Sequence, residues 1–174
     1  MQHANTVTSS GTDRRRTRGR PGRRPDAVSL LKSDHKQVKA WFREFERGGS
    51  RSRKNQLAQR ICNTLKVHTR IEEEIFYPAF LAAGIDLAMH HEAEVEHDTA
   101  KELISAIESF GPEHEYFEAR MKVLAELIAH HIKEEEQRDG MFAKARAGGL
   151  DLKQLGEQLR QRRNELEGDG RRES

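Results

Sequence analysis

Six ionisable residues occupy positions in this 174-residue sequence where a helical protein would be expected to place leucine or isoleucine. They are His35, His68, Glu72, His97, His131 and Glu135. Each continues a row of apolar residues spaced three or four apart, which on a helix marks the buried face. An ionised carboxylate or an unpaired imidazole in a dry core is costly unless it is paired or binds a metal. These six residues are therefore the first candidates for chemistry.

A single histidine on an apolar face is more often a hydrogen-bonded core residue than a ligand. Two features of the set favour a shared function instead. Four successive helical segments each contribute a histidine, and the spacing His-x-x-x-Glu occurs twice, at His68–Glu72 and at His131–Glu135. Residues four apart lie one above the other on a helix, so each pair offers two ligands along one edge of the core. The pattern predicts a metal site.

The donor types narrow the choice of metal. Nitrogen and carboxylate oxygen without thiolate suit iron, manganese or zinc. The single cysteine, Cys62, excludes an internal disulfide framework and any site that needs several cysteines. A mononuclear zinc site needs only three or four ligands, whereas glutamate can bridge two ions. Six protein ligands that include two carboxylates best suit a dinuclear centre completed by solvent-derived oxygen. The alternatives are that the site holds a different metal content or that it holds no metal.

The elements that must position these residues follow from the apolar spacing, because glycine and proline gather at only a few points. Helices are expected over residues 28–47, 54–82, 86–110 and 113–147, with a short amphipathic helix after Asp151. Four long helices with short connections predict an all-α fold, an up-down-up-down antiparallel four-helix bundle. We expect this bundle and its short C-terminal helix to fill residues 27–168, and residues 169–174 to be flexible.

The first 26 residues differ in composition from the rest of the chain. Residues 1–26 carry a net charge of +5 in a chain whose formal net charge is +2, and they contain almost no large apolar side chain. Such a segment is expected to be disordered. Within it, Arg18, Gly19, Arg20 and Pro21 look like the core of an AT-hook, whose arginines enter the narrow minor groove of DNA. A solvated tail, or weak contact with DNA or another polyanion, is the simpler interpretation.

The sequence indicates a cytoplasmic protein without a membrane partner. Its longest apolar runs are a few residues, far short of the ~20 that a membrane-spanning helix needs. The basic start is followed by Pro21–Pro25 rather than by the apolar region of an export signal.

Over roughly residues 28–166 the sequence resembles the hemerythrin-like family, the bacterial HHE cation-binding domains. The likeness is carried by Leu31–Val38, His68–Pro78, Glu96-His97 and His131–Glu136. The resemblance implies a non-haem centre of two iron ions with a bridging oxo or hydroxo group. It also implies that the six residues named above bind the iron and that Glu72 and Glu135 bridge it. Members of the family bind or sense dioxygen, nitric oxide or peroxide, or handle iron under oxidative stress.

The third helix departs from the family's oxygen carriers, which have His-x-x-x-His there. Lys101 stands four residues after His97, so one ligand is missing, and Glu94 is the candidate for an additional ligand in its place. The spacing Glu94–His97 is also that of ferritin-like di-iron proteins, but that pattern fails at His68 and His131. The neighbouring Tyr77, more than one turn after Glu72, is expected to pack in the core.

Further glutamates flank the two His-x-x-x-Glu pairs. Glu73, Glu74, Glu134 and Glu136 are expected to form a charged outer face; the alternative is that they orient the histidines. For the whole chain we expect a module that binds a small ligand, rather than an enzyme. Two alternatives remain. The first is a di-iron enzyme that decomposes peroxide with the same ligands, and the second is a DNA-associated protein that acts through its Arg-rich tail.

Overall fold

The computed structural model describes residues 24–170, with side chains up to residue 168. Residues 1–23 and 171–174 lie outside the described part of the chain. The disorder expected for the tail, and the DNA contact suggested for Arg18–Pro21, therefore stay predictions.

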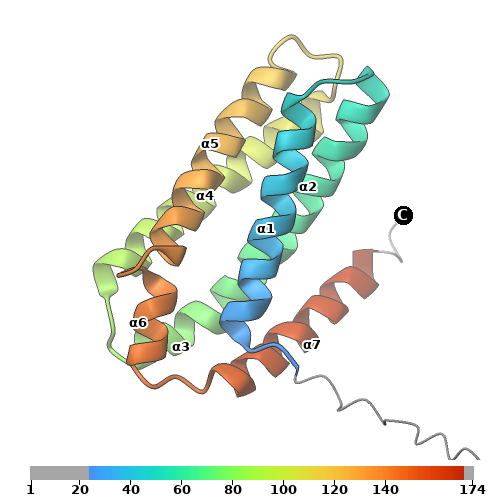
Figure 1. Cartoon of the computed structure of the whole chain (residues 1–174). Helices are drawn as coiled ribbons and strands as arrows, with labels where there is room; N and C mark the ends of the chain where they lie inside the picture. Colours follow the sequence, from blue (N-terminus) through green and yellow to red (C-terminus); the bar gives the residue numbers. More distant parts are fainter. Residues whose placement is uncertain (1–23, 171–174) are drawn as a thin grey trace, which may run out of the picture.

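Four long antiparallel helices form the body of the molecule (Figure 1). They are α1 (Ala27–Glu46), α2 (Arg51–Ile71), α4 (Leu87–Phe110) and α5 (Phe117–Glu136). The remaining segments are η1 (Glu72–Phe76), α3 (Tyr77–Ala82), α6 (Met141–Ala147) and α7 (Leu152–Gly170). Residues 24–170 contain no strand. The predicted all-α, up-down-up-down four-helix bundle is confirmed.

The sequence sets where three of the long helices begin. Asp26, Ser50 and Asp86 each precede a helix, and their side chains accept hydrogen bonds from the backbone N–H groups of the first turn. Such caps satisfy donors that have no partner inside the helix. None of the described helices combines the length and apolar composition that a membrane span requires.

The second long helix changes type where proline enters it. Between Glu72 and Phe76 the backbone forms a π-helix, closed by a hydrogen bond from the Tyr77 N–H to the Glu72 carbonyl. In an α-helix, the ring of Pro78 would press on the carbonyl group of Glu74, four residues earlier. The wider turn accommodates this ring, and the chain continues as α3. The expected helix over residues 54–82 is therefore one rod with a widened turn beside Glu72.

The fourth long helix is shorter than predicted. Instead of running over residues 113–147, α5 ends at Glu136, the chain turns at residues 137–140, and α6 follows. Gly140 makes this turn possible, because a Cβ atom there would lie 2.7 Å from the carbonyl oxygen of Glu135. After this turn the chain enters α6, where Phe142 stacks on the ring of His35 with 5.7 Å between the ring centroids.

Replacing Gly140 by alanine is expected to lower the free energy of unfolding by about 1–3 kcal/mol, because the new methyl group must displace the end of α5. Gly168→Ala is the control. Gly168 lies in α7 with open space around it, so alanine there should be neutral or stabilise by up to about 1 kcal/mol. Denaturant unfolding of both variants measures the difference, and equal stabilities would contradict a close contact at Gly140.

Two apolar clusters fill the bundle. One lies toward the α1–α2 turn and includes Phe42, Ile61 and Leu124. The other includes Leu31 and residues of η1, α3, α6 and α7. The C-terminal helix α7 spans 19 residues, longer than the short helix predicted, and it packs against α1, α2 and η1. The six residues predicted to bind metal belong to neither apolar cluster.

Candidate metal centre

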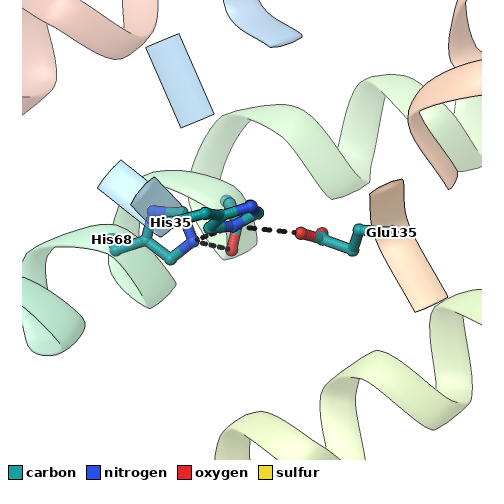
Figure 2. Close-up of side chains that lie close together, drawn as sticks. His35, His68 and Glu135 are labelled. Atoms are coloured by element: carbon teal, nitrogen blue, oxygen red, sulfur yellow. Dashed lines mark hydrogen bonds and ion pairs between the residues drawn. The ribbon is translucent and has the colours of Figure 1, made fainter. Parts of the chain in front are cut away.

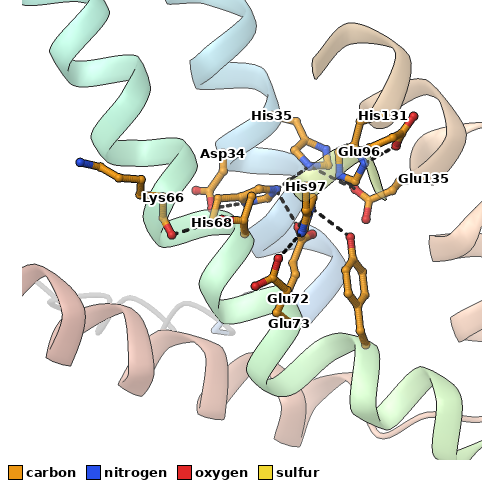
Figure 3. A network of polar contacts seen from close by, with 12 residues as sticks. Asp34, His35, Lys66, His68, Glu72, Glu73, Glu96, His97, His131 and Glu135 are labelled. Carbon is orange, nitrogen blue, oxygen red and sulfur yellow. Dashed lines mark hydrogen bonds and ion pairs between the residues drawn. The ribbon is translucent and has the colours of Figure 1, made fainter. Parts of the chain in front are cut away.

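The structure brings the six predicted residues together in the middle of the bundle (Figure 3). His35 comes from α1, His68 from α2, Glu72 from η1, His97 from α4, and His131 and Glu135 from α5. Each of the six is at most 3% exposed. Residues that are far apart in the sequence therefore lie together in one buried layer of the bundle.

The six side chains form two overlapping groups of potential metal donors. His35, His68, Glu72 and Glu135 make the first group, and Glu72, His97 and His131 make the second. Within each group one donor atom from every residue lies within 4.8 Å of all the others. Glu72 belongs to both groups.

Each of the two glutamates stands between two histidines (Figure 3). Figure 2 shows Glu135 beside His35. Oε2 of Glu72 lies 3.2 Å from Nε2 of His68 and 3.4 Å from Nε2 of His97. Oε2 of Glu135 lies 3.3 Å from Nε2 of His35 and 3.6 Å from Nε2 of His131. Both carboxylates therefore link a histidine of the first group with one of the second, which is the placement a bridging ligand needs.

The other ring nitrogen, Nδ1, of each of the four histidines contacts a carboxylate. The pairs are His35 with Glu136 at 2.8 Å, His68 with Asp34 at 3.2 Å, His97 with Glu73 at 3.0 Å and His131 with Glu96 at 2.8 Å. When Nδ1–H donates to a carboxylate, the lone pair of the neutral ring is left on Nε2. Metal-binding histidines are commonly held in this way.

The four carboxylates link the helices in a closed ring. Asp34 on α1 contacts the histidine of α2, and Glu73 on η1 contacts that of α4. Glu96 on α4 contacts the histidine of α5, and Glu136 on α5 returns to that of α1. Each carboxylate therefore orients the histidine of the next helix around the bundle.

A cation bound between His35 and His68 would explain why their rings lie so close together. Their Nε2 atoms are 3.0 Å apart. When both rings are neutral and both Nδ1–H groups donate to carboxylates, both Nε2 atoms carry lone pairs and neither can donate a hydrogen bond to the other. Burial lowers the pKa of His35 to about 3, so this ring is neutral at physiological pH. A shared metal ion would accept both lone pairs.

The buried carboxylates of Glu72 and Glu135 would also be stabilised by a bound cation. None of their four carboxylate oxygens has a hydrogen-bond donor among the described residues. Burial raises the pKa of Glu72 to about 7. Burial, followed by the nearby Glu72 carboxylate, raises the pKa of Glu135 well above its usual range. A cation would stabilise both ionised carboxylates, so the donor set fits a metal.

The additional ligand expected at Glu94 is not part of this cluster. Its side chain is 54% exposed and lies 3.5 Å from Nδ1 of His90. It belongs to a separate group with His90 and His91 near the start of α4. Lys101, which stands where the family's oxygen carriers have a further histidine, bonds to Glu73 at 2.7 Å instead.

Sequence reasoning did not assign roles to several of the residues at the site. For Glu73 and Glu136 a charged outer face was expected, with orientation of the histidines as the alternative, and both do contact histidines. Glu74 and Glu134 bond to other side chains outside the site. Asp34 and Glu96 were not singled out individually. All four histidine-orienting carboxylates are sequence neighbours of a candidate ligand, and this is the signal that could have found them.

Tyr77, expected to pack in the core, also reaches the site. Its hydroxyl lies 3.2 Å from Nε2 of His97. Its ring stands between those of His90 and His97, with centroids 5.4 Å and 5.3 Å away. The tyrosine is 1% exposed. A phenol is therefore fixed beside the second donor group.

A small cavity adjoins the cluster. Its volume is about 10 Å³, close to the space that one water molecule occupies. Its lining includes the four histidines and Asp34. The other lining residues are mainly aliphatic and include Val38, Leu65, Ile128 and Ile132. The cavity is therefore lined both by candidate metal ligands and by aliphatic side chains.

Replacing Glu136 by glutamine is expected to weaken metal binding by roughly 10- to 100-fold, because the His35 ring loses its charged acceptor. That hydrogen bond holds the pKa of Glu136 below its usual range. Glu134→Gln is the matched control, since Glu134 also adjoins Glu135 but bonds to Gln137 outside the site. Competition with a metal chelator measures both affinities. Equal affinities would show that the His35–Glu136 contact does not support the site.

Comparison with known proteins bears on the family and on the fold. The model of the family described as "Hemerythrin HHE cation binding domain" matches residues 26–143. A solved HHE cation-binding domain-containing protein from Mycobacterium kansasii is similar in fold, with a TM-score of 0.69 and 24% identity. That match covers 83% of this chain and 89% of the other.

A curated protein is also similar to this chain. It is a DNA nickase from Nostoc sp., 24% identical over 110 residues, which are 62% of this chain. The chain spans only 30% of that relative's length.

Proposed function

Since the chain belongs to the hemerythrin HHE cation-binding domain family, we propose that its buried histidines and glutamates hold two iron ions. The first ion would take the group of His35 and His68, and the second the group of His97 and His131. Glu72 and Glu135 would bridge them. The observation that carries the proposal is the sharing of Glu72 by two groups of histidines that carboxylates orient.

The choice of iron rests on the donor set and the family. Imidazole and carboxylate ligands without thiolate are typical of non-haem iron, although manganese and zinc accept similar donors. Bound iron would supply redox chemistry and open coordination positions. The protein would bind the ions, fix the histidine rings through the four outer carboxylates and keep bulk water away.

The proposed physiological ligand is a small molecule such as dioxygen, nitric oxide or peroxide, which the protein binds or senses. The cavity beside the histidines supports this size class, because it has room for about one water-sized group. The aliphatic residues in its lining favour the weakly polar dioxygen and nitric oxide among these ligands.

Metal analysis of the protein purified from cells tests the proposal. The expected content is two iron ions per chain, with manganese and zinc at trace level. Absorption spectra of the reduced, iron-loaded protein should then change on addition of dioxygen, nitric oxide or peroxide. Protein that holds no iron, or iron-loaded protein that responds to none of the three, would overturn the proposal.

The same ligands would serve an enzyme that decomposes peroxide. Both functions would use the same arrangement of residues, so a measurement of catalytic turnover is needed to distinguish the enzyme from the binding protein. Catalytic oxygen evolution from added peroxide, sustained over many turnovers per site, would assign the enzyme. A single stoichiometric spectral change without oxygen evolution would assign the binding protein.

A second proposal is that the Arg-rich tail holds the protein near DNA, because residues 1–26 carry a net charge of +5 and include Arg18, Gly19, Arg20 and Pro21. Deleting residues 1–23 keeps the capping residue Asp26 and the whole bundle. The deletion should abolish salt-sensitive retention on immobilised DNA and leave the metal content unchanged. Unchanged retention would end this second proposal.

A further inference from the structure

We propose that His90, His91 and Glu94 form a separate metal site near the start of α4, which binds one divalent transition-metal ion of the zinc type. The ligands would be Nδ1 of His90, a ring nitrogen of His91 and a carboxylate oxygen of Glu94. One donor atom from each of the three residues lies within 4.8 Å of the other two. The site is distinct from the buried centre, because His90 precedes His97 by two helical turns, about 10 Å of helix rise.

The first argument is a buried ring nitrogen without a partner. His90 is 5% exposed, and its Nδ1 atom has no hydrogen-bond partner among the described residues. Oε2 of Glu94 lies 3.5 Å from this Nδ1, beyond the usual length of a hydrogen bond. Two ligands at ~2.0–2.1 Å from a tetrahedral zinc ion are about 3.3–3.4 Å apart. The separation therefore fits two ligands of one ion better than it fits a hydrogen-bonded pair.

The second argument is that the fold sets the positions of these side chains. Asp86 caps α4, and His90 and Glu94, four residues apart on this helix, lie one above the other. The ring of Tyr77 packs against that of His90 at 84°, with 5.4 Å between the centroids, and so fixes the buried ligand. His91 and Glu94 are exposed, so they can adjust to a cation that arrives from solution.

The third argument is charge and donor type. Between Asp86 and Thr99 the chain contains five acidic residues and no lysine or arginine, so this part of α4 attracts cations. Two imidazole nitrogens and one carboxylate oxygen suit zinc and its neighbours among the transition metals, whereas magnesium and calcium prefer oxygen ligands alone. Three protein ligands leave a fourth position for water, as in zinc sites of the open type.

Zinc titration of the iron-loaded protein, in competition with a chromogenic chelator, tests this inference while iron occupies the buried centre. We expect one zinc ion per chain. His91→Ala and Glu94→Gln each remove one of three ligands, so each should weaken zinc binding by about tenfold or more and leave the iron content unchanged. Glu102→Gln is the matched control. Glu102 is an exposed glutamate of the same helix and belongs to none of the donor groups found among the described residues, so its replacement should leave zinc binding unchanged.

The possible results separate this inference from the proposed function. Iron-loaded protein that binds no zinc, or Glu94→Gln protein that binds zinc as tightly as the unchanged protein, overturns the zinc site and leaves the di-iron proposal standing. Loss of zinc binding in His130→Ala but not in Glu94→Gln would assign the ion to Glu92, Glu96 and His130, and would also overturn it. If the protein takes up no iron, the di-iron proposal fails. The zinc site is then tested by whether Glu94→Gln binds one zinc ion fewer than the unchanged protein.

Discussion

Replacing Glu72 by glutamine is expected to reduce metal binding by about a hundredfold or more and to affect both ions together. An amide cannot bridge two cations as a carboxylate does, and removing one charged partner of a buried ionic cluster typically costs about 3–5 kcal/mol. Glu72 is the one residue that both donor groups share. Metal analysis after reconstitution and desalting should find almost no bound iron.

Glu74→Gln is the matched control for this experiment. Glu74 lies two residues further along and carries the same charge, but its carboxylate faces outward. It accepts hydrogen bonds from Arg70 and Arg162, each at 2.6 Å. This variant should keep its full metal content. A Glu72→Gln protein that is folded by circular dichroism and still retains both ions would contradict a shared carboxylate.

Removing the metal from the unchanged protein is expected to lower its melting temperature by about 10 °C. A ligand at a thousandfold excess over its Kd contributes about 4 kcal/mol, and each kcal/mol shifts the Tm of a chain of this size by about 2–4 °C. The metal-free bundle must also keep two buried glutamates that have no hydrogen-bond donor among the described residues. Calorimetry before and after chelation measures the shift.

The opposite result is expected for a variant in which Glu72 and Glu135 are both glutamine. Its amide N–H groups can donate to the histidine Nε2 atoms, which lie 3.2–3.6 Å from the present carboxylate oxygens. Without metal, this double variant should melt above the metal-free unchanged protein, and added iron should not stabilise it. Equal melting temperatures for the metal-free proteins would show that the buried carboxylates do not strain the fold.

The candidate ligands could be predicted from the sequence because each interrupts a row of apolar residues. Helical periodicity fixes which face of a helix a residue occupies, and a buried histidine or glutamate on that face is unusual enough to stand out. The same reasoning could not assign Asp34 or Glu96 to a particular histidine. Each contacts a histidine on another helix, and that pairing depends on how neighbouring helices are rotated and offset.

Two other differences have local causes. Tyr77 was expected away from Glu72 because α-helical spacing was assumed, whereas the turn before Pro78 is a π-turn. The fourth helix was expected to continue past Glu136 to residue 147, because the first glycine pair after it is Gly148-Gly149. It ends there because the chain folds back closely at Gly140. In both places the backbone leaves the regular period next to a candidate ligand.

The ring of carboxylate–histidine contacts has a consequence for how the domain opens. Because the ring is closed, every bundle helix takes part in two of its contacts, once through a carboxylate and once through a histidine. Fraying of α5 alone would break its contacts with both α4 and α1 and leave two buried groups without partners. Such partial opening should cost nearly as much as complete unfolding, so the four helices should behave as one cooperative unit in native-state hydrogen exchange.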